Sequence, residues 1–244
     1  MKYFPIITKL LIFVFAIFFL FGCYATTHRG PATLKPGQFS GNIGYLHLKG
    51  ANASAADNPA KLVTADVRAG ILKFWDLGLM RTFDYTDYEG ADFEGMDTYW
   101  LDTKFQLSNL DNKDYLPQFA LGYGFGDLIA DDEEDTKLFV NSLYLTIGVP
   151  TEFVTPYYSF RYEHVSDEIK WLPSWAWEEE FNTLQKAHII GFEVNAIDFV
   201  KPVIEVGRFY VDDFSEGANV FTAGLNFYLD IPKLLSPKEV PVAE

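Results

Sequence analysis

The chain has little cysteine and few basic residues. It contains one cysteine, Cys23, and 19 lysines and arginines against 34 aspartates and glutamates, so its formal net charge is −15. A single thiol excludes an intramolecular disulfide and a thiolate metal cluster. Because contacts with phosphate backbones need a basic surface, the charge balance argues against nucleic-acid binding.

Common catalytic motifs are also missing. The sequence has no P-loop, no Gly-x-Ser-x-Gly elbow, no His-Glu-x-x-His pair and no dinucleotide-binding glycine pattern that opens a helix. The four histidines are scattered, and no acidic cluster has the spacing of a calcium-binding loop. We therefore predict no metal site and no cofactor, and we interpret the acidic clusters as solvated surface segments.

An apolar leader opens the chain. Two lysines precede an apolar run over residues 10–21, which is followed by Gly22 and Cys23. The run is shorter than the roughly 20 residues of a membrane-spanning helix, and this layout is typical of a secretory signal. We predict a signal peptide over residues 1–22.

The end of the leader carries a second signal. The tetrapeptide Leu-Phe-Gly-Cys that ends at Cys23 resembles the lipobox of bacterial lipoproteins, which implies that Cys23 is lipidated and becomes the N-terminus. Ordinary signal cleavage after Ala25 is the alternative. We expect residues 23–36 to form a lipidated or flexible tether.

The rest of the chain alternates apolar and polar residues in about ten segments. A period of two is typical of strands that face lipid on one side and a polar interior on the other, and 17% of the residues are aromatic. We predict an all-β, antiparallel up-and-down transmembrane β-barrel over residues 37–231, with a periplasmic tail over 232–244. Ten strands fit best, with eight or twelve as alternatives, and their expected ranges are 38–49, 61–71, 76–86, 97–108, 115–125, 138–149, 153–166, 186–197, 202–211 and 218–230.

The links between these segments are alternately short and long. Short periplasmic turns, long outer loops and an even strand count are features of bacterial outer-membrane barrels. We therefore expect the protein in the outer membrane of a Gram-negative bacterium. Its partners would be outer-membrane lipid, including lipopolysaccharide, and the barrel-assembly machinery, while the oligomeric state stays open.

Alternation places several charged side chains inside the predicted barrel. Small inner residues, such as Gly122 and Gly124, predict a narrow interior. Mixed charges in a narrow interior favour a paired network that stabilises the fold, and a small solute pore is the alternative. The predicted interior residues are Asp66, Arg68, Asp102, Lys104, Arg161, Glu163, Glu193 and Glu205.

One short motif indicates catalysis. His164 and Ser166 share the face of strand 153–166 that is predicted to look outward at lipid. The pattern aromatic-x-His-x-Ser resembles the lipid A 3-O-deacylase family of outer-membrane barrels. The resemblance implies Ser166 as the nucleophile, His164 as its base and an acid from the following loop, Glu178 or one of the two glutamates after it.

The same loop is rich in tryptophan. Trp171, Trp175 and Trp177 are predicted to lie at the membrane interface, which tryptophan prefers, and a patch that binds an acyl chain or glycan is the sharper alternative. The sequence as a whole predicts a structural, surface-binding or small-pore barrel. A membrane-embedded esterase that acts on outer-leaflet lipid is the alternative function.

Overall fold

Ten strands form one closed antiparallel barrel. The computed structural model describes residues 29–49, 60–86, 96–130, 137–166, 182–195, 199–211 and 217–235. Each strand pairs with its neighbours in the sequence, and β1 closes the barrel against β10, so the predicted fold and strand number are confirmed. The elements are β1 (Gln38–Lys49), β2 (Ala60–Leu72), β3 (Trp75–Asp84), β4 (Met96–Gln106), β5 (Gln118–Ala130), β6 (Lys137–Gly148), β7 (Val154–Ser166), β8 (Asn182–Val194), β9 (Val200–Val211), β10 (Ala218–Asp230) and the helix α2 (Ile231–Leu235).

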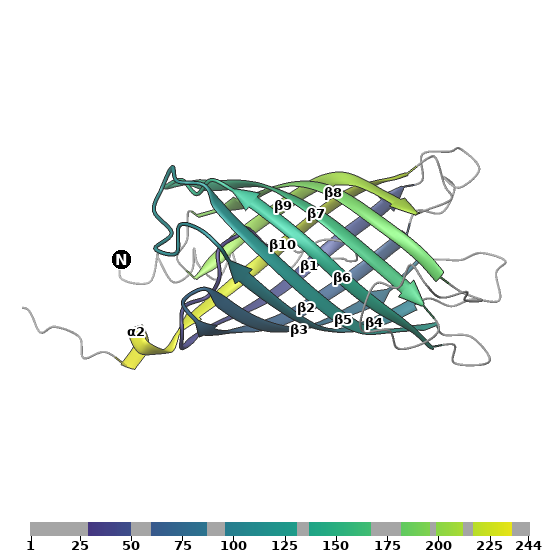
Figure 1. Ribbon diagram of the computed structural model, residues 1–244, viewed down its shortest axis with the longest axis horizontal. Coiled ribbons are helices and arrows are strands. Elements are labelled where there is room, and N and C mark those ends of the chain that lie inside the picture. The colour runs from purple at the N-terminus through teal and green to yellow at the C-terminus, as the bar shows by residue number, and fades with distance from the viewer. Residues whose placement is uncertain are drawn as a thin grey trace, which may run out of the picture.

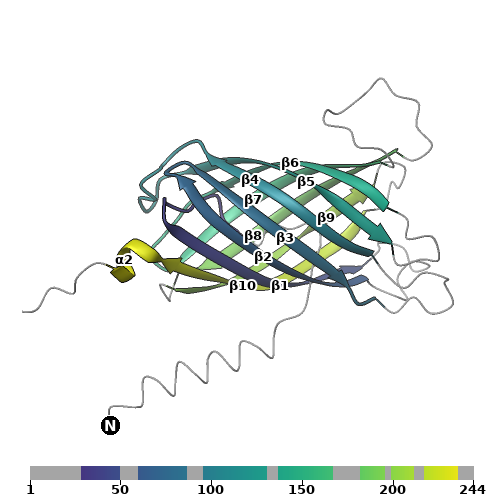
Figure 2. The same cartoon turned by 90° about the horizontal axis from the view of Figure 1, so that it is seen from below.

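The two ends of the barrel differ. The strands run obliquely around its axis, and α2 lies at the same end as the turn between β4 and β5 (Figures 1 and 2). We call this the terminal end, because β1 begins there at Gln38 and β10 ends there at Asp230. We call the opposite end, where β1 ends at Lys49 and β2 begins at Ala60, the loop end.

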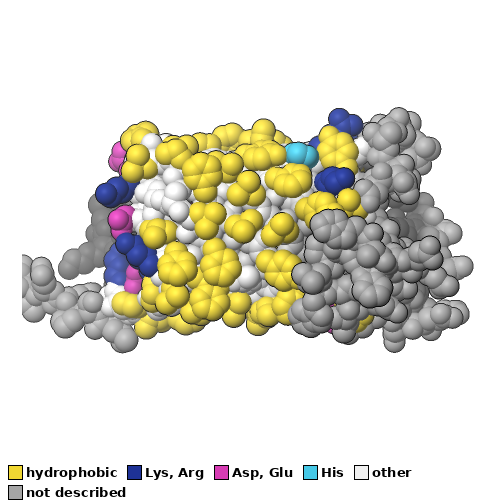
Figure 3. All heavy atoms as spheres, viewed as in Figure 1, with side chains coloured by type: hydrophobic (Ala, Val, Ile, Leu, Met, Phe, Trp, Pro, Cys, Tyr) yellow, Lys and Arg dark blue, Asp and Glu magenta, His cyan; other side chains and the backbone are white. Residues whose placement is uncertain are grey.

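Each strand separates an apolar outer face from a buried inner face. On β2, Thr64 and Arg68 are buried, whereas Val67 is 61% exposed. Successive side chains of a strand point to opposite sides, so this alternation follows directly from the sequence. Figure 3 shows the result as a nearly continuous apolar wall, which is the construction of a barrel that crosses a membrane.

Among the described residues, no helix has the length and apolar character needed to cross a membrane.

The strands β1 and β10 have their predicted bounds, six others differ by one or two residues, and β5 and β8 differ by three residues or more. β5 begins at residue 118 rather than 115, because the preceding turn holds three non-glycine residues with positive φ: Asn109, Asn112 and Tyr115. The side-chain amide of Asn109 donates to two backbone carbonyls of this turn. β8 begins at residue 182 rather than 186, because its ladder with β7 continues to the pair of Asn182 and Ser166.

Small inner residues of β5 make room for large side chains of neighbouring strands. A Cβ atom on Gly122 would lie 1.9 Å from Cζ of Tyr144, and one on Gly124 would lie 3.0 Å from Cε3 of Trp100. Tyr144 and Trp100 are 2% and 3% exposed. The small residues therefore do not widen the interior, because aromatic rings fill the space beside them.

Candidate functional site in the barrel interior

Arg68 is the centre of an ion cluster in the middle of the barrel. Its Nε donates to Oδ1 of Asp76 at 2.9 Å, and its Nη1 pairs with Asp102. The hydroxyl of Tyr144 donates to Oδ1 of Asp102 at 2.9 Å. These groups come from β2, β3, β4 and β6, so the cluster links strands across the interior.

Arg161 on β7 continues this layer. Its Nε lies 2.8 Å from Oγ of Ser142 and 2.6 Å from Oε1 of Glu163. The centre of its guanidinium lies 4.9 Å from the ring centroid of Trp100 and 5.8 Å from that of Tyr144. A guanidinium over an aromatic face is attracted by the ring as well as by the carboxylate. The charge of Arg161 is therefore matched inside the barrel.

Two glutamates hold the opposite side of the interior. Oε1 of the fully buried Glu205 accepts a hydrogen bond from the hydroxyl of Tyr157 at 2.6 Å. Glu193 pairs with Lys201 at 3.0 Å and accepts a hydrogen bond from Tyr228 at 3.1 Å. These contacts link the four strands from β7 to β10. Removing one partner from such a buried pair leaves an uncompensated charge.

The chain before β1 enters the barrel at the terminal end. Arg29 is 4% exposed and pairs with Asp66 inside the barrel. Nζ of Lys104 donates to the carbonyls of Gly30 and Ala32 at 3.3 and 2.7 Å. Residues 29–36, which we name the inner segment, are thus held by interior groups on two sides.

Residues 33–35 of the inner segment also contact the wall. The amide of Thr33 donates to Oε1 of Gln106 at 2.8 Å, and that of Leu34 donates to Oδ2 of Asp76 at 3.2 Å. A Cβ atom on Gly70 would lie 2.1 Å from the carbonyl oxygen of Lys35, so only glycine permits this close approach. We expected residues 23–36 to form a lipidated or flexible tether. Within this range, residues 29–34 line the interior, where the backbone of Thr33 and Leu34 bonds to buried side chains, and Lys35 and Pro36 are exposed.

The loop-end half of the interior combines two apolar clusters with buried polar side chains, among them Thr82, Thr98 and Glu163. One cluster packs residues of β1, β2, β8 and β10 together, and a second packs Trp100, Val140 and Val165. The first cluster consists of Leu46, Leu62, Ala187, Ile189 and Val220. A solute that entered from the terminal end would have to pass these two clusters after the ion clusters.

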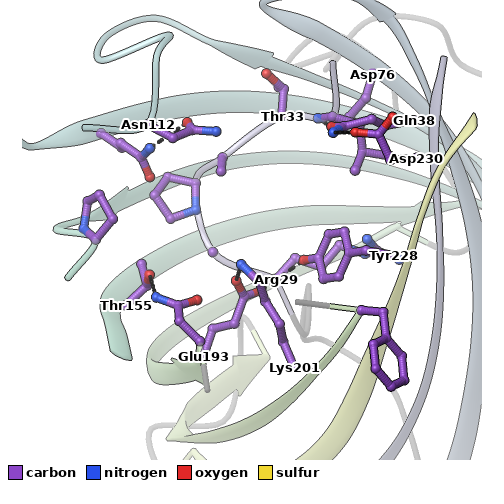
Figure 4. Close-up of a pocket in the computed structure, with 18 of the residues that line it drawn as sticks. Arg29, Thr33, Gln38, Asp76, Asn112, Thr155, Glu193, Lys201, Tyr228 and Asp230 are labelled. Atoms are coloured by element: carbon purple, nitrogen blue, oxygen red, sulfur yellow. Dashed lines mark hydrogen bonds and ion pairs between the residues drawn. The ribbon is translucent and has the colours of Figure 1, made fainter. Parts of the chain in front are cut away.

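Interior cavities differ in size between the mouth and the middle. A cavity of about 980 Å³ opens at the terminal end beside the inner segment. Figure 4 shows Thr33 and Asp76 on one side of this mouth and Glu193 and Lys201 on the other. Farther in, the cavity between Arg68, Asp102 and Arg161 measures about 20 Å³, which is room for one water molecule.

The structure places the eight charged residues of the predicted interior in this polar network. Seven are buried, and the side chain of Asp102 is 15% exposed. Strand alternation also places Asp76 inside the barrel, although Asp76 is not among the predicted interior residues. Sequence patterns could not indicate Arg29, because it precedes the first strand.

The predicted catalytic pair is not presented to the membrane. Val165 packs in the interior, so His164 and Ser166 lie on the other face of β7, as expected from alternation. His164 is 9% exposed and Ser166 is 0% exposed, whereas Tyr158 on the same face is 37% exposed. Both residues take part in interactions within the protein.

Other residues of interest lie outside the described part of the chain. They are the lipidation candidate Cys23, the predicted acid Glu178 and the interface residues Trp171, Trp175 and Trp177. Among the residues that are described, no group of three or more histidine, cysteine, aspartate or glutamate side chains is arranged to hold a metal ion.

Neither a protein-family model nor a curated protein matches the sequence. Among solved structures, the N-terminal β-barrel domain of Pseudomonas aeruginosa OprF matches with a TM-score of 0.39 and 9% identity, over 80% of this chain and 100% of that one. The outer-membrane protease OmpT of Escherichia coli matches with a TM-score of 0.39 and 12% identity, over 81% and 99%. The KdgM porin matches with a TM-score of 0.37 and 10% identity, over 76% and 98%. These likenesses are too distant to assign a role.

Proposed function

We propose that the protein is a non-conducting barrel of the bacterial outer membrane, which anchors the segments joining its strands at the loop end. The observation that carries this proposal is the filled interior. The ion clusters around Arg68 and Arg161 span its middle, and two apolar clusters pack next to them toward the loop end.

The interior argues against a pore in the state described. Passage through the middle would require the Arg68 pairs to open, because the cavity beside them measures about 20 Å³. Passage would then require desolvation of the solute against Leu46, Ile189 and Trp100. A barrel filled in this way serves as a rigid scaffold rather than as a channel.

The segments that this scaffold would carry are acidic in sequence. Residues 131–135 between β5 and β6 read Asp-Asp-Glu-Glu-Asp, and three glutamates at 178–180 precede β8. Short turns at the terminal end would face the periplasm, so the acidic segments would face the cell exterior. This arrangement suits a surface-binding or structural role.

Conductance measurements test the proposal. The purified protein, inserted into planar lipid bilayers, should give no single-channel steps. A variant that removes bulk from the middle, with Trp100, Tyr144 and Arg161 all changed to alanine, should give steps if it folds. The matched control is Tyr158→Ala, which removes an aromatic ring from the outer face and should stay silent.

Insertion must be shown independently of conductance. Heat-dependent mobility in gel electrophoresis and circular dichroism of the same vesicles report whether each variant is a folded barrel. Regular conductance steps from the folded unaltered protein would contradict the proposal and would restore the small-pore alternative. The esterase alternative receives no support from the buried Ser166.

A further inference from the structure

The outer wall over β7, β8 and β9 carries charge of one sign. The glutamates of these strands that the structure describes, Glu163, Glu193 and Glu205, all point inward. Besides the buried His164, the basic residues at outward positions are Lys186, His188 and Arg208. This wall is therefore basic, although the chain as a whole has a net charge of −15.

These basic residues lie side by side. Arg208 is opposite His188 in the ladder between β8 and β9, and Lys186 is opposite Tyr210. The centre of the Arg208 guanidinium lies 5.6 Å from the ring centroid of Tyr210. We name Lys186, His188, Arg208 and Tyr210 the basic patch.

Aromatic residues hold the histidine of the basic patch in place. Nδ1 of His188 lies 2.6 Å from the hydroxyl of Tyr158, within hydrogen-bond distance. The ring centroid of His188 lies 5.1 Å from that of Phe160 and 6.1 Å from that of Tyr210. The patch therefore has a defined shape and is not a set of isolated surface side chains.

The basic patch lies toward the loop end of the membrane-facing wall. Arg208 is three residues from Val211, where β9 ends at that side. An arginine that faces lipid is costly at the bilayer midplane and nearly free of cost near the interface, and tyrosine prefers the interface. Figure 3 shows lysine or arginine side chains and a histidine at the loop-end edge of the apolar wall.

We propose that the basic patch binds the phosphate groups of a phosphorylated glycolipid, such as lipid A, in the outer leaflet. A guanidinium recognises phosphate through two parallel charge-assisted hydrogen bonds, and Lys186 on the neighbouring strand adds positive charge. No carboxylate points outward from the described parts of these three strands.

Arg81 provides a comparison on another part of the wall. It also points outward and stacks on aromatic rings, with its guanidinium centre 4.2 Å from the ring of Phe83 and 4.7 Å from that of Tyr99. However, Nη2 of Arg81 already donates to Oδ2 of Asp97 at 2.6 Å. A phosphate would have to displace this carboxylate, so Arg81 should not contribute to binding.

Native mass spectrometry of the full-length protein in detergent micelles tests this inference. The protein is titrated with lipid A that carries both phosphates, and separately with the same lipid A after enzymatic removal of the phosphates. The phosphorylated form should bind, and Arg208→Gln should weaken this binding about tenfold, as expected for loss of one charge-assisted contact. The matched control Arg81→Gln should bind as the unaltered protein does.

Several outcomes would overturn the inference. They are equal binding of the dephosphorylated lipid, unchanged binding by folded Arg208→Gln, or an equal loss in Arg81→Gln. Equal binding of phosphatidylglycerol would show recognition of any anionic lipid, and complete displacement by millimolar inorganic phosphate would show a small-anion site. Circular dichroism of each variant excludes misfolding as the cause of a loss. Lipid binding by the basic patch does not depend on whether the barrel conducts, so the two tests can fail independently of each other.

Discussion

The two halves of the interior differ in their share of ionic and apolar side chains. The middle and terminal end hold ion pairs and the inner segment, whereas the loop-end half holds the apolar clusters around Leu46 and Trp100. Apolar packing needs only shape and volume, but buried ions need every partner in place. We therefore expect the ionic half to tolerate single substitutions less well than the apolar half.

The largest effect is expected in the ionic half. Arg68→Ala leaves Asp76 and Asp102 without their shared cation and should lower the free energy of unfolding by about 4 kcal/mol. Urea unfolding in lipid vesicles, followed by tryptophan fluorescence, measures this change. A neutral variant, which combines Arg68→Met with Asp102→Asn, should recover most of the loss, because Asp76 keeps Lys104 as a partner at 3.9 Å. A loss that persists in full in the neutral variant would contradict the electrostatic explanation.

The apolar half should respond through cavity formation. Leu46 is completely buried, so Leu46→Ala should lower the free energy of unfolding by about 3 kcal/mol. Ile43 on the same strand points outward and is 38% exposed, so lipid can fill the space left by Ile43→Ala. The same urea titration should therefore show a clearly smaller loss for Ile43→Ala. Equal losses would mean that the two faces of β1 do not differ as described.

Two adjacent tyrosines on β7 allow a comparison of the interior with the outer wall. Tyr157→Phe removes the hydrogen bond to the buried Glu205 and should cost about 2 kcal/mol of unfolding free energy. Tyr158→Phe removes a hydrogen bond to His188 on the outer wall and should cost at most about 1 kcal/mol. Unfolding midpoints in urea rank the two variants. A larger loss of stability in Tyr158→Phe than in Tyr157→Phe would contradict the view that the interior bond matters more.

The smallest effect is expected at an exposed ion pair on the terminal end. Lys73 and Asp111 lie 2.6 Å apart, with side chains 51% and 60% exposed, so Lys73→Ala should leave the unfolding midpoint unchanged. The hydrogen bond from Lys73 lowers the pKa of Asp111. Any stability that this ion pair contributes is therefore present above the ordinary carboxyl pKa. It disappears as the pH falls through the lowered pKa of Asp111. A midpoint shift at neutral pH that persists in acid would show that Lys73 acts through something other than this pair.

Strand alternation predicts most of the interior, but not how its charges pair. The period of two places Asp66, Arg68 and Asp102 inside without any knowledge of their neighbours. The partner of each charge depends on ladder register and on distances across the barrel. Asp66 pairs with Arg29 rather than with Arg68, two positions away on its own strand. No sequence period could indicate this choice, because Arg29 belongs to no strand.

The sequence by itself determined the ten strands and their inner and outer faces, because these follow from local alternation. Only the tertiary structure decided that residues 29–34 line the mouth, that an aromatic ring fills the space beside Gly122, and that Ser166 is buried. These features depend on contacts between groups far apart in the chain. Closure of the barrel brings such groups within reach of one another, and no local pattern records those distances.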